Sequence, residues 1–175
     1  MTAKGHIALA LLPAIPIASF LNTQEQIVFL GAVGFGSLLP DIDEPNSFIG
    51  RRLGFVSIPL KILGVKHRTF THYLIFPFFI FIFSLFLSRI WQIAGFGVAL
   101  GILMHDIGDM MTKGGIKGFL YPFFKNRTFR ILPKKFAFYT NSFTEYIIIT
   151  FLFLIDSYMY YSFMFNSLYT LGVYR

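Results

Sequence analysis

The chain has 175 residues, about the length of one ordinary domain. Hydrophobic residues make up 55% of it and charged residues only 13%, against about a quarter charged in soluble proteins, so an ordinary soluble protein is excluded and an integral membrane protein is indicated. The net charge of +7 leaves nucleic acid as a possible partner, but a multispanning protein also collects Lys and Arg in its cytoplasmic loops, which is the simpler interpretation.

Two short apolar segments open the chain. Residues 7–21 imitate a signal peptide, but two prolines interrupt them and no small-x-small cleavage site follows, so we expect a retained first helix. Residues 27–39 predict a second helix, with a turn and N-cap supplied by residues 22–25 and an end at Pro40. Both are shorter than the about 20 residues that a span requires, so a short or re-entrant hairpin is one interpretation of the pair.

Three longer apolar segments follow. Residues 73–87 and 146–165 are strong candidates for transmembrane helices, because their apolar runs and flanking aromatic residues suit a membrane span. Residues 91–111 predict another helix, apolar in its first part. Its last turns carry three ionisable residues, His105, Asp106 and Asp109.

The predicted fold class is all-α: a multi-pass integral membrane helical bundle of about five hydrophobic helices. We expect a single membrane-embedded domain over residues 1–175, with polar cytoplasmic loops at about 41–71 and 112–144. Small residues allow helices to approach closely in lipid, and five glycines in the second and fourth segments suggest such packing. They are Gly31, Gly34, Gly36, Gly97 and Gly101.

Alternation of the five helices places nearly all basic residues on one side of the membrane. Only Arg89 and Arg175 fall on the other side. By the positive-inside rule the first side, which includes the amino terminus, is cytoplasmic. Its basic residues are Lys4, Arg51, Arg52, Lys61, Lys66, Arg68, Lys113, Lys117, Lys125, Arg127, Arg130, Lys134 and Lys135.

The same topology brings all four histidines and several acidic residues to this side. Ionisable residues at membrane level are costly and usually face a polar interior where they act, so the grouping favours a metal site. Cysteine is absent, so any metal is bound through His, Asp or Glu. The candidate ligands are His6, Asp41, Asp43, His67, His72, His105 and Asp109.

Spacing suggests how some of these residues act together. His105 and Asp109 are four residues apart, so on a helix they share a face and can bind one ion. Asp41 and Asp43 can point the same way if the segment after Pro40 is extended, and could then bridge two cations or bind one cation and orient a ligand. Asp106 points about 100° away from His105, and its role stays open.

The ligand types limit the metal and the reaction. Imidazole and carboxylate without thiol suit zinc first, with manganese, iron and nickel as alternatives, and one or two ions fit. Such ions lower the pKa of water and polarise phosphoryl or acyl oxygens. A Ser/His/Asp hydrolase is disfavoured, because no G-x-S-x-G motif occurs and Ser37 is its nearest imitation.

Four basic residues of the adjoining loops are candidates for holding a phosphate: Arg51, Arg52, Arg68 and Lys113. The first two also serve the positive-inside rule, whereas Arg68 lies within HRTFTH and has the stronger functional claim. The basic, aromatic stretch 113–135 suggests contact with anionic lipid rather than nucleic acid.

Four stretches taken together resemble the YdjM-like family of LexA-regulated, membrane-bound, metal-dependent hydrolases. They are MTAKGH, LLPDIDEPNSFIGRRL (38–53), HRTFTH (67–72) and LGILMHDIGDMMTKGG (100–115), which occur in order over the first two thirds of the chain. The resemblance implies a helical inner-membrane protein with a divalent-metal site. The family's matching positions are His6, Asp41, Asp43, His67, His72, His105 and Asp109.

The family also has a distant similarity to zinc-dependent phospholipase C, whose ligands include an H-x-x-x-D pair. That similarity suggests His105 and Asp109 as ligands, with Asp41 and His67 or His72 completing the cluster. Within HRTFTH we expect His72 to be the firmer ligand, His67 a ligand or general acid, and Arg68 a phosphate clamp. Catalytic roles are predicted for Asp43, His67 and Arg68.

The leading functional prediction is a metal-dependent hydrolase of the bacterial inner membrane. It is expected to cleave a phosphoester of a lipid or lipid-linked substrate at the cytoplasmic face, using water activated by the metal. The first alternative is a non-enzymatic membrane protein in which the His/Asp cluster is a structural metal site. A transporter is the third, because His and Asp within a membrane also serve ion pathways. Against it, no acidic residue lies in the opposite half of the third or fourth helix, and Asp156 in the fifth helix is the exception.

Overall fold

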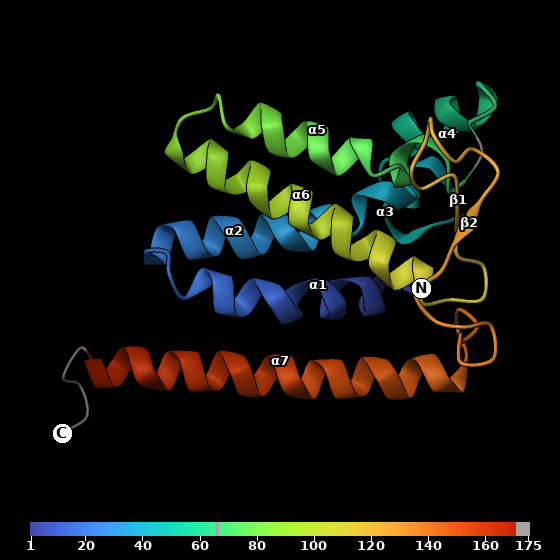
Figure 1. The fold of residues 1–175 in the computed structure, drawn as a ribbon. Coiled ribbons are helices and arrows are strands. Elements are labelled where there is room, and N and C mark those ends of the chain that lie inside the picture. The colour runs from blue at the N-terminus through green and yellow to red at the C-terminus, as the bar shows by residue number, and fades with distance from the viewer. Residues whose placement is uncertain (66, 171–175) are drawn as a thin grey trace.

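Five long helices lie side by side in the computed structural model, which describes residues 1–65 and 67–170, without the side chains of the last five (Figure 1). Lys66 and Arg175, both used in the topology prediction, lie outside the described residues. The helices agree in position with the five predicted segments. They are α1 (Ala3–Ala18), α2 (Thr23–Gly36), α5 (Ile75–Ser84), α6 (Arg89–Met110) and α7 (Phe143–Thr170).

Helix α6 is the centre of the bundle, because it packs against α1, α2 and α5, whereas α7 packs on α1 at one edge. Of the helices searched in the described chain, Arg89–Met110 and Phe143–Phe165 are long and apolar enough to cross a membrane. Helices α1 and α5 are apolar but shorter. The predicted five helices are therefore present, and two of them qualify as spans by length and composition.

The boundaries of the first two helices follow from local chemistry. Helix α1 continues through its two prolines and ends at Ala18, three residues earlier than predicted. Helix α2 begins after Asn22, whose side chain accepts the N–H of Glu25 while the Glu25 carboxylate accepts the N–H of Asn22. This reciprocal cap satisfies donors that no helical carbonyl can reach, and it confirms the predicted N-cap.

The two predicted loops contain more regular structure than their polarity suggests. Residues 41–71 include short helices, and the side chain of Ser47 caps one of them by accepting the N–H of Gly50. These elements are η1 (Leu39–Asp43), α3 (Phe48–Arg52), α4 (Gly54–Ile62) and η2 (Phe70–His72). Residues 112–144 contain a short antiparallel pair that the sequence did not predict, β1 (Ile116–Lys117) with β2 (Thr128–Phe129), in a chain that is otherwise mostly helical.

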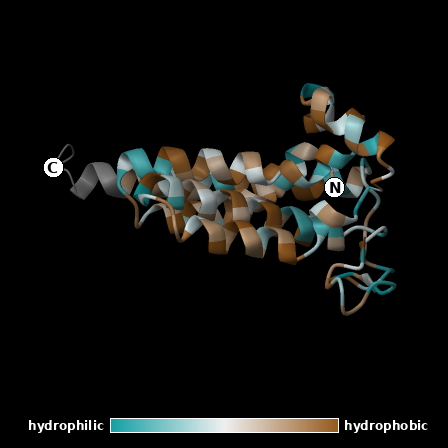
Figure 2. Ribbon diagram, turned by 90° about the horizontal axis from the view of Figure 1, so that it is seen from above, coloured by the Kyte–Doolittle hydropathy of each residue, from teal (hydrophilic) through white to brown (hydrophobic). Residues whose placement is uncertain are grey.

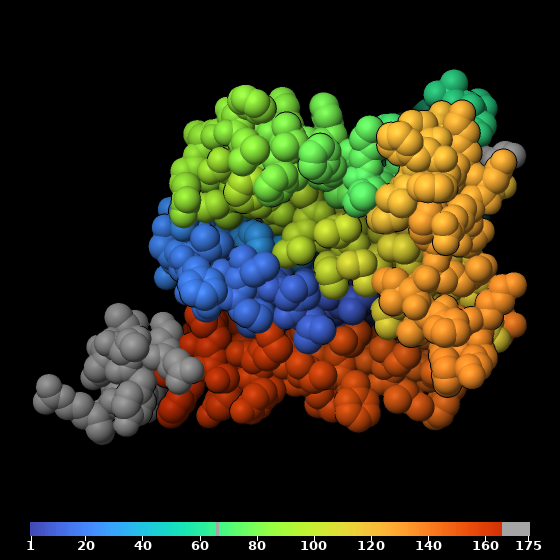
Figure 3. All heavy atoms as spheres, viewed as in Figure 1, coloured from blue at the N-terminus to red at the C-terminus, as the bar shows by residue number. Residues whose placement is uncertain are grey.

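Short elements and loops gather at the end of the bundle that carries the amino terminus, and tight turns connect the helices at the other end (Figure 1). Figure 2 shows hydrophobic residues along the outside of the bundle and more hydrophilic residues in these loops. In Figure 3 the segment of about 118–140, in orange, covers that end of the molecule. The ionisable residues singled out in the sequence lie beneath this cover or beside it.

Close packing of α2 and α6 depends on three of the five predicted glycines. A Cβ at Gly101 would lie 2.3 Å from the Val33 carbonyl oxygen, and one at Gly36 would lie 2.4 Å from the Val98 carbonyl oxygen. Gly97 is similarly close to Phe29, with 2.7 Å to its carbonyl oxygen. The prediction is wrong for Gly31 and Gly34, which have nothing within 4 Å.

We expect Gly101→Ala to destabilise the protein by about 2 kcal/mol or more, because the added methyl group meets backbone atoms that cannot move aside locally. Gly34→Ala is the matched control on the partner helix. It is expected to be neutral or slightly stabilising, since Ala is the better helix former and the site is open. Thermal unfolding of the two variants in the same detergent measures the difference, and equal shifts would contradict the packing role.

Candidate metal centre

Five ionisable side chains from four separate elements converge at the amino-terminal end of the bundle. Two overlapping groups have ligand atoms within 4.8 Å of one another: one comprises His6, His105 and Asp109, and the other comprises Asp41, His72 and His105. All five residues were predicted as ligands from the sequence. Helix α1 supplies one of them, η1 and η2 one each, and α6 two.

The distances between imidazole Nε2 atoms and carboxylate oxygens describe a compact cluster. Asp41 Oδ1 lies 3.6 Å from Nε2 of His105 and 3.9 Å from Nε2 of His72. Asp109 Oδ2 lies 3.8 Å from Nε2 of His72, and its Oδ1 lies 3.5 Å from Nε2 of His6. The rings of His6 and His105 are stacked, with centroids 3.6 Å apart. The i, i+4 prediction for α6 is consistent with the 4.0 Å between His105 Nε2 and Asp109 Oδ2.

Hydrogen bonds determine which nitrogen of two rings is available. His105 Nδ1 lies 2.7 Å from the carbonyl oxygen of Ser37, which can only accept, so Nδ1 carries the proton. The Thr71 hydroxyl donates to Asp43 and therefore accepts from His72 Nδ1, at 3.0 Å. The Nε2 lone pairs of both rings are left facing the cluster.

The histidine nitrogens without hydrogen-bond partners indicate whether a metal ion fits the cluster. Nε2 of His6, His72 and His105 are all buried and have no hydrogen-bond partner in the described part of the chain. Buried polar atoms are rarely left in this state. His72 and His105 are also fixed through Nδ1, as is typical of metal ligands, whereas Nδ1 of His6 has no hydrogen-bond partner among the described residues either. The donor set of three imidazoles and two carboxylates, without sulfur, fits a divalent ion of the zinc type.

Asp43 interacts with protein donors on both of its oxygens. Its Oδ1 lies 2.8 Å from His67 Nδ1, and its Oδ2 accepts the Arg68 backbone N–H at 3.2 Å and the Thr71 hydroxyl at 3.1 Å. The segment after Pro40 is a 3-10 helix and not extended, so the expectation that Asp41 and Asp43 point the same way is wrong. Asp41 approaches the imidazoles of the cluster, whereas Asp43 orients the HRTFTH segment.

Burial and neighbouring charges shift the pKa values at this end of the bundle. Burial raises the pKa of Asp41, but the His105 ring beside it outweighs that effect and holds the pKa below its ordinary value. Burial lowers the pKa of His72, helped by the nearby His105 ring. Burial also lowers the pKa of His67, but its contact with Asp43 and the charges of Asp43 and Asp41 raise it overall.

The raised pKa of His67 predicts a pH dependence of stability in the metal-free protein. Protonated His67 stabilises the folded state fully below the ordinary pKa of 6.5, and this contribution is lost as the pH rises through the higher folded-state value. The melting temperature of the parent should therefore exceed that of His67→Gln most at about pH 6, and the advantage should shrink towards about pH 8. A difference independent of pH would show that His67 is not charged when paired with Asp43.

Arg68 joins the HRTFTH segment to the end of α6. Its Nε lies 2.8 Å from Asp109 Oδ2, an ion pair, and its Nη1 donates to the carbonyl oxygen of Gly115 at 3.1 Å. The backbone of Arg68 adopts a left-handed conformation, with φ of 62°. Gly114 provides the room for the guanidinium, because a Cβ there would lie 2.4 Å from Arg68 Nη1.

The other predicted phosphate-binding residues lie outside the cluster. Arg52 stacks on Phe48 within its own helix at 3.7 Å, and Arg51 is exposed. Lys113 places its Nζ 4.1 Å from the centre of the Tyr139 ring. Of the four candidates, only Arg68 reaches an ionisable residue of the cluster in the described structure.

Several contributing groups were not found from the sequence. The Ser37 carbonyl and the Thr71 hydroxyl orient histidines, but backbone acceptors have no signal in a sequence. The amino group of Met1 lies 2.5 Å from Asp109 Oδ1, and the fully buried Glu145 of α7 accepts the Thr2 N–H. Asp106 is also fully buried, and neither of its oxygens has a hydrogen-bond partner among the described residues.

Comparison with known proteins identifies the family of this chain. The chain matches the family described as YdjM inner membrane protein over residues 1–173. The chain belongs to the YdjM family. Its members in this comparison include the inner membrane protein YdjM of Escherichia coli strain K12, which is 36% identical over 129 residues, covering 66% of this chain and 63% of that protein. The aligned part of the chain thus spans less than two thirds of that relative.

A second relative matches over almost its full length. The uncharacterized protein YvsG of Bacillus subtilis strain 168 is 31% identical over 163 residues, 92% of this chain and 95% of that protein. The inner membrane protein YbcI of Escherichia coli is 29% identical over 126 residues, 65% of this chain and 68% of that protein. No solved structure matches the chain. Membership in the YdjM family agrees with the predicted resemblance and with an inner-membrane location, and the names of these relatives state no reaction.

Proposed function

We propose that the chain is a membrane-bound, metal-dependent hydrolase that cleaves a phosphoester. The observation that carries the proposal is the convergence of three buried Nε2 atoms without partners, two carboxylates and the Asp43–His67 pair at one end of the bundle. Purely structural packing would not require three unpaired imidazole nitrogens to face one another. Metal binding followed by hydrolysis accounts for both the ligands and the adjacent proton-transfer pair.

One ion fits the geometry better than two. Both ligand groups share His105, and its Nδ1 is already used by the Ser37 carbonyl, so its single free nitrogen can bind only one ion. The residues that would hold the ion are drawn from His6, Asp41, His72, His105 and Asp109. A divalent ion bound there would supply Lewis acidity and lower the pKa of a water molecule.

His67 is placed to transfer a proton. Asp43 fixes its Nδ1, and its Nε2 faces the cluster, 3.9 Å from Asp41 Oδ1. The side chain is 36% exposed, whereas those of His72 and His105 are fully buried, so a substrate or water can reach it. His67 can therefore accept a proton at Nε2 or return one to a leaving group, the role of a general acid–base.

Arg68 is the proposed phosphate-binding residue. It is partly exposed, and its ion pair with Asp109 holds the guanidinium at the edge of the cluster. Guanidinium groups match the geometry of phosphate oxygens, so Arg68 can orient an anionic substrate and stabilise charge that develops on it. The assignment agrees with the role predicted from the sequence.

Gly114→Ala tests this role of Arg68 without removing a charge. The new methyl group meets only the tip of the flexible Arg68 side chain, so we expect little loss of stability but a displaced guanidinium. The KM for a phosphoester should rise about tenfold while bound metal is unchanged, a loss of roughly 1.4 kcal/mol of binding. Gly54→Ala is the control, because its methyl group would meet Ile58 at an ordinary contact distance of 3.7 Å. An unchanged KM would remove Arg68 from substrate binding.

We further propose that the five long helices are all embedded in the membrane, with the amino terminus and the metal centre at the cytoplasmic face. The positive-inside distribution supports this orientation, and the location of the short elements at the same end is consistent with it. Phospholipid or lipid-linked phosphoesters are then the substrates within reach. Cysteine substitutions at Lys61 and Arg89, labelled from either side of intact spheroplasts, test the orientation.

The second candidate function is a structural metal site in a protein without enzymatic activity. One observation favours it: Asp109 already pairs with Arg68 and with the Met1 amino group, so the cluster also links three segments of the chain. In that case loss of the metal would unfold the bundle without affecting any reaction. His67 separates the two candidates, because it lies outside both ligand groups.

The decisive experiment measures metal content and phosphoester hydrolysis in the purified protein and in His67→Gln. We expect the parent to bind about one divalent ion and to hydrolyse an aryl phosphodiester or phosphatidic acid. His67→Gln should keep the ion and lose about 100-fold or more in kcat. Arg52→Gln, outside the cluster, should match the parent. Absence of bound metal in the parent would remove the proposal, and hydrolysis unaffected by His67→Gln would remove its general acid–base.

A further inference from the structure

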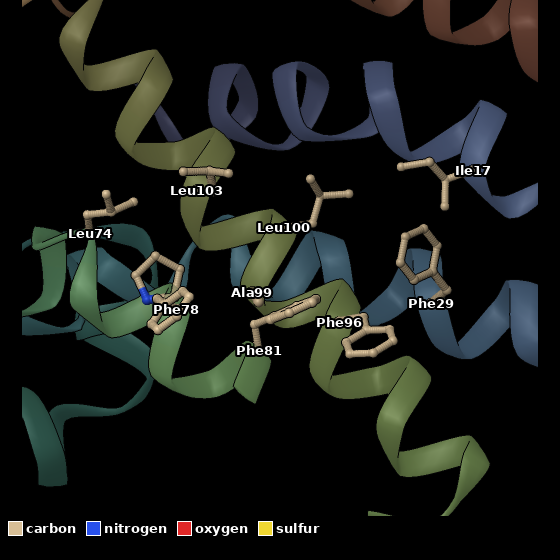
Figure 4. A pocket seen from close by; sticks show the side chains of 10 residues that line it. Ile17, Phe29, Leu74, Phe78, Phe81, Phe96, Ala99, Leu100 and Leu103 are labelled. Carbon is tan, nitrogen blue, oxygen red and sulfur yellow. The ribbon is translucent and has the colours of Figure 1, made fainter. Parts of the chain in front are cut away.

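An apolar groove lies on the bundle and is lined by residues of α1, α2, α5 and α6 (Figure 4). Its volume is about 390 Å³, and every residue that lines it is apolar. Leu74, Phe78, Phe96, Leu100 and Leu103 form much of its wall. Figure 4 shows Leu74 at one end of the groove, with Ile17 and Phe29 at the other.

The far end of the groove lies about the depth of one bilayer leaflet from the level of the candidate ligands. Along α6 it extends to Phe96, nine residues from His105, which is about 13 Å at 1.5 Å per residue. Along α1 it extends to Ile17, eleven residues from His6, or about 16 Å. Half of the roughly 30 Å hydrocarbon core is about 15 Å, so a chain reaching from the level of the centre to the far end would span one leaflet.

One end of the groove is formed by residues close in sequence to the candidate ligands. Leu74 lies two residues after His72, and it also lines a second apolar hollow together with Phe78, Leu120 and Tyr121. The Lys125 ammonium group lies 5.3 Å from the centre of the Tyr121 ring. Leu74 is thus shared by two apolar hollows, one of which has a cation near its wall, and it lies two residues from a candidate ligand. The apolar tail and the anionic head of a phospholipid match these two kinds of surface.

We propose that this groove binds one fatty-acyl chain of a cytoplasmic-leaflet phospholipid, holding its phosphoester at the metal centre. The inference rests on the proposed function and on the proposed membrane orientation, and it specifies the substrate class as a long-chain lipid. The groove selects by length, because a short chain leaves apolar wall uncovered at its far end. Each methylene removed from contact with the groove forfeits burial of apolar surface and packing.

Photolabelling tests the groove without requiring turnover. The parent protein in nanodiscs is irradiated with phosphatidic acid that carries a diazirine near the end of one long acyl chain. We expect the label at the far end of the groove, around Ile17, Phe29 and Phe96. Unlabelled phosphatidic acid should compete, whereas inorganic phosphate should not.

Two groove variants and one control variant show whether the labelling depends on the groove. Leu100→Trp fills the groove and should lower its labelling at least fivefold, whereas Ile155→Trp adds the same side chain to the exposed face of α7 and should not. Phe78→Ala, at a position 61% exposed and therefore tolerant, removes part of the wall and should lower labelling at least twofold. Equal labelling of the outer face of α7, or crosslinks between two copies at the groove, would overturn the proposal.

The labelling and hydrolysis experiments can contradict the groove proposal and the hydrolase proposal independently of each other. Groove labelling in a protein without hydrolytic activity would support lipid binding and overturn the hydrolase. Hydrolysis with the same kcat/KM for short-chain and long-chain phosphatidic acid, unaffected by Leu100→Trp, would uphold the hydrolase and overturn the groove. The expected result is at least tenfold preference for the long chain, reduced by Leu100→Trp alone among the two tryptophan variants.

Discussion

Replacing His105 by glutamine is expected to lower bound divalent metal from about one ion per chain to nearly none. His105 is the ligand common to both overlapping groups, so no alternative set of three ligands within the described residues survives its loss. The affinity should fall by more than 100-fold, beyond the 10- to 100-fold usual for residues that only orient a ligand. Metal analysis of the purified variant after dialysis measures it.

Stability has to be separated from ligand loss in this variant. The substitution also removes the donor to the Ser37 carbonyl, an unsatisfied group that costs about 1–3 kcal/mol. Met104→Ala is the control, because it removes packing from both hydrophobic clusters at the neighbouring position and carries no ligand atom of either group. It should melt earlier and keep its metal. Full metal content in His105→Gln would show that the centre is assembled from other residues.

Replacing Asp43 by asparagine is expected to destabilise the protein by about 3 kcal/mol while leaving bound metal unchanged. The Asp43 side chain is buried, and its carboxylate bonds His67, Arg68 and Thr71. Hydrogen bonds to charged groups contribute about 1.5–3 kcal/mol each, and an amide cannot accept on both sides. Thermal unfolding and metal analysis are measured on the same preparation.

Asp41→Asn provides the opposite pattern on the same short helix. Asp41 is partly exposed and belongs to a ligand group, so its variant should lose metal affinity with a smaller loss of stability in the metal-free state. The two carboxylates, separated by one residue, would thus be distinguished by function. If Asp43→Asn emptied the centre instead, Asp43 would be a ligand, as the sequence also allowed, and not the residue that orients His67.

The convergence of the five candidate metal ligands was predictable because helix order and the predicted membrane sidedness constrain where helix ends lie. His6, Asp41, His72 and the pair on α6 all occur at ends that topology assigns to one face, and the structure brings them together. The separate tasks of Asp41 and Asp43 were not predictable. They depend on a 3-10 turn after Pro40, whereas the alternation of the two acids suggested an extended segment.

The remaining differences concern interactions that leave no pattern in a sequence. Arg51, Arg52 and Arg68 have the same charge and all lie near the motifs, but only the left-handed backbone at Arg68 and the space at Gly114 direct one of them into the cluster. Gly31 and Gly34 cannot be distinguished by composition from Gly36. Which glycine faces a neighbour depends on the rotation of α2 about its axis.

The contact of Gly101 with α2 also has a consequence for the chemistry of the site. Gly101 touches the backbone at Ser37, and His105, one turn further along α6, receives its orientation from the carbonyl of that same serine. The distance between the α2 and α6 backbones therefore helps to determine the orientation of the His105 ring, a candidate ligand. A larger residue at position 101 would thus disturb the orientation of His105 one turn away as well as the packing of the two helices. In the proposed metal site, Gly101 therefore influences the affinity for the ion without being a ligand.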